Sequence, residues 1–112
     1  MTRRADSPGS LKVPLGELDR LLEHRTRLAI VVLLSRNDAI NFSRLKDLLG
    51  ETDGSLGSHL LKLEEEGRIV ARKEFKDRKP VTWYSLTKRG RETLVAHLGA
   101  LDRLIRQAAG GR

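Results

Sequence analysis

The chain has 112 residues, with 22 Lys or Arg against 15 Asp or Glu, and its formal net charge is +7. This length predicts one domain with a single core. The lack of cysteine excludes disulfides, thiolate zinc sites and cysteine nucleophiles, and it is typical of the reducing cytosol. The longest apolar run, 28–34, is far shorter than the roughly 18 residues that a membrane span needs, so we expect a cytoplasmic protein.

The N-terminal part of the chain is predicted to be a tail followed by two helices. Residues 1–12 combine charges with Pro, Gly and Ser, which is typical of a flexible tail, and a single domain is expected over 13–109. A first helix is predicted over 14–23, where leucines recur at helical spacing after a proline that the first turn tolerates. Residues 26–35 are apolar almost all round and are expected to form a buried central helix.

Two further helices with a tight turn between them follow. Residues 42–49 place apolar side chains at helical spacing and stop at Gly50, which suits a helix of about two turns with a glycine past its end. After a short turn, Thr52 or Asp53 is expected to cap a helix over 53–66. Two helices joined in this way are typical of a helix-turn-helix.

Beyond this helix the apolar spacing changes from a helical period to the alternation of β-strands. Two strands are predicted over 69–75 and 81–86, with a basic five-residue tip, 76–80, between them. A last helix over 87–109 would be roughly 34 Å long, more than so small a core can cover. We therefore predict a mainly α fold with a small β-hairpin, the winged helix-turn-helix.

The positive charge is concentrated in one part of the chain. Residues 68–91 carry nine basic and two acidic side chains, a local net charge equal to the +7 of the whole chain. This concentration favours a dedicated contact with a polyanion over general solubility, and it suits DNA, RNA or an acidic membrane surface.

The helix predicted over 53–66 has two different faces. Leu56, Leu60 and Leu63 fall at helical spacing and must face the core. Another side is polar and mostly small, as entry into a DNA major groove about 12 Å wide requires. Glycine inside a helix costs roughly 1 kcal/mol relative to Ala. The presence of Gly54 and Gly57 despite this cost is explained if a DNA backbone comes close, although Gly57 can also serve tight helix packing. The residues of this helix predicted to contact DNA are Asp53, Gly54, Ser55, Gly57, Ser58, His59 and Lys62.

The predicted hairpin is the second candidate contact with DNA. Long cationic side chains on a narrow loop can reach phosphates or lie in an adjacent minor groove, and Arg78 is the first choice for this role. Trp83 and Tyr84 are expected to pack in the core or on the strands, because only four aromatic residues are available. The hairpin residues predicted to contact DNA are Arg72, Lys73, Lys76, Arg78 and Lys79.

The sequence contains no pattern of an enzyme or a metal site. It has no Ser-His-acid set at a family spacing, no glycine-rich phosphate loop and no histidine pair at i, i+4. His24, His59 and His97 are far apart along the chain, and His24 could approach His97 only through folding or dimerisation. We therefore expect no catalytic residue, no metal and no cofactor.

Several motifs in the chain resemble one protein family. They lie within residues 15–105 and include Thr52-Asp53-Gly54, Ser58-His59-Leu60 and Arg78-Lys79-Pro80-Val81-Thr82-Trp83. In these motifs the chain is similar to the small MarR/ArsR-type winged-helix transcriptional regulators of bacteria and archaea. The resemblance implies a cytoplasmic homodimer, joined through its first and last helices, that binds a near-palindromic operator with recognition helix 53–66 and wing tip 76–80. The cysteines with which many ArsR relatives sense metals are missing, and so are the longer terminal helices that shape the ligand pocket of many MarR relatives.

The function predicted from these features is that of a homodimeric regulator that binds specific double-stranded DNA sequences. Helix 53–66 would enter the major groove and hairpin 69–86 would contact the backbone or minor groove, with the two recognition helices about 34 Å apart. The alternative is a protein-interaction scaffold without specific DNA binding, whose hairpin meets an acidic partner, and RNA binding is a third option. The residues expected at the dimer interface are Leu15, Leu18, Leu22, Leu94, Leu98, Leu101 and Ile105.

Overall fold

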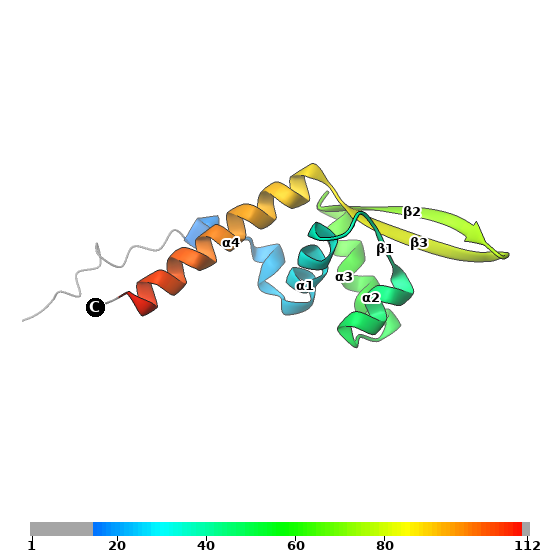
Figure 1. Cartoon of the computed structure of the whole chain (residues 1–112), viewed down its shortest axis with the longest axis horizontal. Coiled ribbons are helices and arrows are strands. Elements are labelled where there is room, and N and C mark those ends of the chain that lie inside the picture. The colour runs from blue at the N-terminus through cyan, green and yellow to red at the C-terminus, as the bar shows by residue number, and fades with distance from the viewer. Residues whose placement is uncertain (1–14, 111–112) are drawn as a thin grey trace, which may run out of the picture.

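The computed structural model describes residues 15–110, so the predicted tail 1–12 and Pro14 lie outside the described residues. Figure 1 shows α1, α2 and α3 packed together, with α4 extending to one side of them and the β2–β3 hairpin to the other. This arrangement confirms the predicted winged helix. The elements in chain order are η3 (Leu15–Glu17), η4 (Arg20–Glu23), α1 (Arg25–Ser35), β1 (Ile40–Asn41), α2 (Phe42–Leu49), α3 (Asp53–Glu65), β2 (Ile69–Lys76), β3 (Lys79–Leu86) and α4 (Lys88–Ala109).

Polar side chains cap all four α-helices, and at α1 the cap is the His24 ring, which accepts from the Thr26 amide over 3.2 Å. Asn41 accepts a hydrogen bond from the Arg44 amide at the start of α2, and Thr52 accepts one from the Ser55 amide at the start of α3. Thr87 caps α4 in the same way. Because these side chains satisfy amides that the helix itself leaves free, they determine where each helix begins. The predicted bounds of α2, α3 and α4 are confirmed to within one residue at each end.

The prediction of one α-helix over 14–23 is wrong. The described part of this segment forms two short 3-10 helices, η3 and η4. Asp19 separates them, because its side chain caps η4 by accepting from the Leu21 amide. The Asp19 backbone amide donates to Nδ1 of His97 over 2.8 Å and is therefore not available for a continuous helix.

The sheet has three antiparallel strands in the order β1-β3-β2, and β1 was not predicted because it has only two residues. The predicted five-residue tip of the hairpin is also wrong, since β2 and β3 pair as far as Lys76 and Lys79. Only Asp77 and Arg78 form the turn, both with positive φ. Such a turn matches the right-handed twist of the flanking strands. We call β2, this turn and β3 together the wing, residues 69–86.

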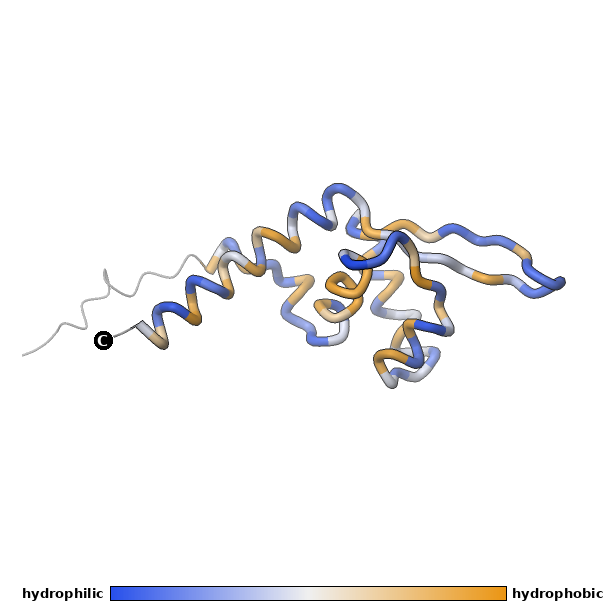
Figure 2. The backbone as a smooth tube through the Cα atoms, in the orientation of Figure 1, coloured by the Kyte–Doolittle hydropathy of each residue, from blue (hydrophilic) through white to orange (hydrophobic). Residues whose placement is uncertain are grey.

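The core lies where α1, α3 and the inner end of the wing meet, and Figure 2 shows the apolar α1 at the centre and the hydrophilic wing tip far from it. Tyr84 is buried there, as predicted. Trp83 is half-buried on the strands and donates from Nε1 to Oε1 of Glu74 over 2.8 Å. The most fully buried large side chains are Leu22, Ile30, Val31, Leu34, Leu45, Leu56, Leu60 and Leu63.

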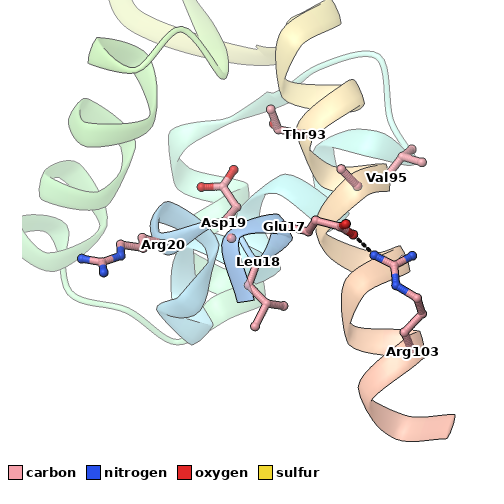
Figure 3. Close-up of a pocket in the computed structure, with 10 residues that line it drawn as sticks. Glu17, Leu18, Asp19, Arg20, Thr93, Val95 and Arg103 are labelled. Carbon is pink, nitrogen blue, oxygen red and sulfur yellow. Dashed lines mark ion pairs between the residues drawn. The ribbon is translucent and has the colours of Figure 1, made fainter. Parts of the chain in front are cut away.

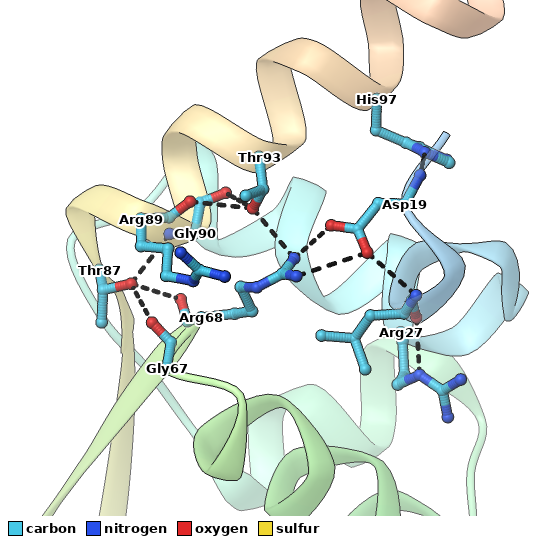
Figure 4. A network of polar contacts seen from close by, with 10 residues as sticks. Asp19, Arg27, Gly67, Arg68, Thr87, Arg89, Gly90, Thr93 and His97 are labelled. Carbon is cyan, nitrogen blue, oxygen red and sulfur yellow. Dashed lines mark hydrogen bonds and ion pairs between the residues drawn. The ribbon is translucent and has the colours of Figure 1, made fainter. Parts of the chain in front are cut away.

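A polar network connects η4 and α4 with the start of the wing (Figure 4). The buried guanidinium of Arg68 forms an ion pair with Asp19 and donates to the Thr93 hydroxyl over 3.1 Å. His97, also buried, accepts from the backbone amide of Asp19. We call these four residues the Arg68 network. Because a buried ion pair that loses one partner leaves an uncompensated charge, the network specifies how these three elements sit together.

Gly90 allows α4 to approach the segment that precedes β2. A Cβ atom at this position would lie 2.1 Å from the Arg68 carbonyl oxygen and 2.7 Å from Cδ1 of Leu86. The first of these contacts is to backbone, which cannot move aside as the end of a flexible side chain can. The base of the wing therefore packs against α4 only because this residue has no side chain.

Replacing this glycine should destabilise the fold. We expect Gly90→Ala to lower the free energy of unfolding by about 2 kcal/mol or more in urea denaturation, because the methyl group forces the backbones apart. Gly99→Ala is the matched control in the same helix, since its Cβ would meet only the end of the Arg103 side chain at 3.9 Å. That variant should be as stable as the parent, or more stable by up to about 1 kcal/mol. Equal stability of the two variants would contradict this description.

Candidate nucleic-acid interface

Helix α3 has one face that packs in the core and another that is open to solvent. Leu56, Leu60 and Leu63 are at most 1% exposed, as the sequence predicted. Burial of a leucine side chain contributes roughly 2 kcal/mol, so these three residues hold the helix firmly against the rest of the protein. Gly54, Ser58 and Lys62 are exposed on the outside of the same helix, and so is Leu61.

Two of the predicted contact residues on the outer face of α3 have side chains that are free to reach a ligand. Ser58 is exposed near the middle of the helix. The Lys62 ammonium group lies 3.8 Å from the Glu66 carboxylate, and both side chains are about half exposed. An exposed ion pair of this kind contributes little to stability, so Lys62 can exchange Glu66 for another anion at low cost.

Ser55, in contrast, is hydrogen-bonded inside the protein. Its hydroxyl donates to Oε1 of Glu51 over 2.6 Å, and the Thr26 hydroxyl donates to Oε2 of the same carboxylate over 3.0 Å. Hydrogen bonds to an ionised carboxylate stabilise its charged form. The bond from Ser55, and to a smaller extent the bond from Thr26, therefore lowers the pKa of Glu51 below its ordinary value. Ser55 therefore connects the beginning of α3 to α1 through this carboxylate.

His59 is half-buried between α3 and α1. Its ring packs against the ring of His24, with the centroids 4.2 Å apart, and its Nδ1 lies 3.2 Å from Nη1 of Arg27. Arginine can only donate, so Nδ1 of His59 accepts and the remaining ring proton is on Nε2. Burial lowers the pKa of His59, and the neighbouring His24 ring and Arg27 guanidinium lower it further. The contact of His24 with His59 was missed because it joins two helices that are distant in the sequence.

The beginning of α3 combines an ion pair with two glycines. Asp53 lies 2.8 Å from the Lys46 ammonium group on α2, and this contact raises the pKa of Lys46. A Cβ atom at Gly54 or at Gly57 would meet no heavy atom of the described residues within 4 Å, apart from its chain neighbours and the adjacent backbone of its own helix. Tight packing inside residues 15–110 therefore does not explain Gly57, and this alternative is wrong. The side of α3 at the two glycines is open to close approach from outside.

The wing carries exposed cations along its length and at its tip. Arg72 forms an ion pair of 2.7 Å with Glu74, which also accepts from Trp83, and these two donors lower the pKa of Glu74. Arg72 is therefore partly neutralised. Within the described residues the other four predicted cations of the wing have no ion-pair partner, and all four are exposed: Lys73, Lys76, Arg78 and Lys79.

The predicted dimerisation residues divide between the core and the surface. Leu22 and Leu94 are 1% and 4% exposed, so they have almost no surface to offer a second subunit, and the prediction is corrected for these two. Both hold η4 and α4 in the core of their own chain. Leu15, Leu98 and Ile105 are well exposed. Leu18 and Leu101 are half-buried.

An open groove of about 560 Å³ lies between η3, η4 and α4 (Figure 3). Leu18 and Val95 line it together with the polar side chains of Asp19 and Thr93. An ion pair between Glu17 and Arg103 connects its two sides. Neither this groove nor any other part of residues 15–110 brings together three His, Asp or Glu side chains that could hold a metal ion. No helix in the same range is both long and apolar enough to cross a membrane.

Comparisons with known proteins agree with this geometry. Residues 26–105 match the model of a family described as winged helix DNA-binding domain. A transcriptional regulator homologue from Pyrococcus horikoshii OT3 shares 30% identity over 80% of this chain and 89% of its own, with a TM-score of 0.75. No curated protein matches the chain.

Two more distant structures show the same fold. The YusO protein from Bacillus subtilis is 17% identical over 98% of this chain and 86% of its own, with a TM-score of 0.73. ZitR from Lactococcus lactis, a zinc-responsive MarR family member, is 20% identical over 77% of this chain and 58% of its own, with a TM-score of 0.56. The chain therefore belongs to the winged helix DNA-binding domain family, and its fold is that of MarR-type transcriptional regulators.

Proposed function

We propose that the protein is a homodimeric transcriptional regulator that binds specific sequences of double-stranded DNA. In this proposal α3 enters the major groove with its outer face, and the wing contacts phosphates or the adjacent minor groove. One observation carries the proposal: a leucine-anchored helix with an open, glycine-containing polar side occurs in the same small domain as a long arm with exposed cations. Four of these cations have no ion-pair partner within the described residues.

On α3, Ser58 and Lys62 have the largest role in DNA binding. Ser58 can donate to or accept from a base edge, and Lys62 can reach a phosphate or a guanine. Gly54 and Gly57 permit the sugar-phosphate backbone to come close. Ser55 and His59 position the helix through Glu51, Arg27 and His24, and the Nε2 proton of His59 remains available as a donor. The ion pair with Asp53 holds Lys46 of α2 near the N-terminal end of α3.

The strained backbone of Arg78 at the wing tip supports a role for this residue in DNA binding. Its φ of 66° lies in the left-handed region, where glycine costs least and a long side chain is unfavourable. Strain of this kind persists at functional sites, where the side chain is needed for something other than stability. An arginine at the tip of the arm is well placed to enter a minor groove of negative potential.

Replacing Arg78 with glycine should affect stability and DNA affinity in different ways. Arg78→Gly should leave the melting temperature unchanged or slightly higher, because glycine relaxes the turn. It should weaken binding to every duplex and reduce the salt slope of log K by about 1 for each wing that contacts DNA. Arg106→Gln removes the same charge from α4 and should change neither the salt slope nor the affinity. Fluorescence anisotropy at several salt concentrations measures this, and an unchanged slope for Arg78→Gly would contradict the role of the wing.

Ser58 should act on sequence preference instead. With a duplex selected by the protein from a random pool, Ser58→Ala should reduce the preference for that duplex over random DNA by about fivefold or more, because a base contact is lost. Ser35→Ala, at the end of α1, is the control and should keep the full preference. If Ser58→Ala instead weakened selected and random duplexes equally, α3 would not read bases through this residue.

Dimerisation is proposed through η3 and the outer part of α4. Leu98 and Ile105 lie one above the other at helical spacing, are exposed, and continue the stripe that starts in the core with Leu94. A second copy would cover this stripe. The groove beside it, between η3, η4 and α4, would then face the partner subunit.

The dimer contact can be broken without unfolding the subunit. Leu98→Glu combined with Ile105→Glu should give a folded monomer in light scattering, because two carboxylates would be buried without partners. Its affinity for a palindromic site should fall to that for a single half-site. Gln107→Glu, an exposed change on the same helix, should stay dimeric. A parent protein that is monomeric at high concentration would remove the two-site geometry from the proposal.

A further inference from the structure

Phe75 is an aromatic side chain with little contact to its own protein. It is 78% exposed, more than any other large hydrophobic residue within residues 15–110. Single exposed apolar residues are common on proteins and need no explanation by themselves. Phe75, however, lies two residues before the turn of a projecting arm and directly opposite Pro80 in the strand register. The end of the wing thus presents an apolar pair, Phe75 and Pro80.

The face of the wing that bears this pair is the one that also packs on the helices. Side chains alternate along a strand, so Phe75 shares a face with Ile69, which is buried in the core. Across the strands, Pro80 shares that face with the buried Tyr84. An open groove of about 460 Å³ separates this part of the wing from the start of α2, and its lining includes Lys73, Thr82, Pro80 and Ser43. Phe75 stands beyond Lys73 on the same strand face, toward the tip.

The charges around Phe75 indicate what covers it. Lys73 shares the strand face of the apolar pair, Arg78 lies in the adjacent turn, and Lys76 and Lys79 lie on the other face of the same end of the wing. All four are exposed, and within the described residues none of them has an ion-pair partner. A second copy of the chain would bring the same positive charge, and Figure 1 shows the wing on the far side of the molecule from α4. A partner that fits this site offers negative phosphates next to flat apolar surfaces. A nucleic acid offers both, the phosphates in its backbone and the flat surfaces in its stacked bases.

We propose that Phe75, supported by Pro80, is an apolar wedge that enters the minor groove next to Arg78, partly unstacks one base step and bends the duplex. This inference rests on the proposed function and assigns the wing tip a second task besides charge neutralisation. Apolar side chains inserted in this way kink DNA because the gap they fill opens only on one side. Flexible pyrimidine–purine steps are the easiest to open, so the wing selects DNA sequence through deformability without reading base edges.

The bend is measured with the full chain and a duplex selected by it, labelled at both ends for energy transfer and carrying 2-aminopurine at the step under the wing. The parent should bend the duplex by about 20° or more and raise the 2-aminopurine fluorescence. Phe75→Ala should abolish both signals and weaken binding about tenfold, while Phe75→Leu should retain most of the bend. Val70→Ala is the control, since Val70 is a half-exposed apolar residue of the same strand on its other face. It should behave like the parent.

The failure of the wedge can be separated from the failure of DNA binding. If the parent binds the selected duplex but leaves it straight, or if Phe75→Ala bends DNA as the parent does, the wedge is wrong and the proposed function stands. If the parent binds no duplex and instead binds an acidic peptide such as poly-glutamate through Phe75, both proposals are wrong. Because Phe75 contributes almost nothing to the core, circular dichroism should show the Ala and Leu variants melting at the parent temperature.

Discussion

Burial of the leucine face of α3 is the constraint on which the rest of the structure depends. Leu56, Leu60 and Leu63 are withdrawn from water almost completely, so the helix can neither rotate about its axis nor slide without exposing them. The carboxylate of Glu51 and the ring of His24 then fix the beginning and middle of the helix from the α1 side. What remains outside is a strip of mostly small or polar residues, with Leu61 among them, that the protein itself covers little.

A second constraint places the wing relative to that strip. Arg68, which directly precedes β2, forms an ion pair with Asp19, the cap of η4, and a hydrogen bond with Thr93 of α4. Gly90 lets α4 lie directly on the Arg68 carbonyl. A buried ion pair adds little net stability, but it penalises any arrangement in which one partner is left alone. The same contacts that attach the proposed dimerisation helix therefore also determine the direction of the arm.

The four α-helices could be predicted from the sequence because their signals are local, whereas the two short 3-10 helices before them were wrongly predicted as one helix. The leucine spacing of α3, the Thr52 cap and the Gly50 stop depend on residues within a few turns of each other. The contacts of His59 with His24 and of His97 with Asp19 could not be predicted, since they join distant segments. The turn was predicted to be longer than it is, because neither Asp77 nor Arg78 is the glycine or asparagine that usually marks so tight a hairpin.

Buried core residues and the exposed residues of the proposed dimer interface were the hardest to distinguish, for a physical reason. Leu94, Leu98 and Ile105 continue one apolar line along a single helix, and nothing in their spacing shows where the subunit's own core ends. Only the packing of α4 against α1, η3 and β3 shows that Leu94 is buried and Leu98 is exposed. For the same reason Phe75 is indistinguishable in sequence from an inward strand residue such as Ile69, whereas in the structure it lies beyond the helices that would cover it.

Amide hydrogen exchange of the full chain with and without the selected duplex tests most directly the claim that the open side of α3 and the wing form one DNA-binding surface. We expect added DNA to slow exchange in residues 53–62 and 72–79 together, and to leave exchange in the outer half of α4 as it is in the free protein. Slowing confined to α4, or slowing in the wing without any in α3, would contradict it.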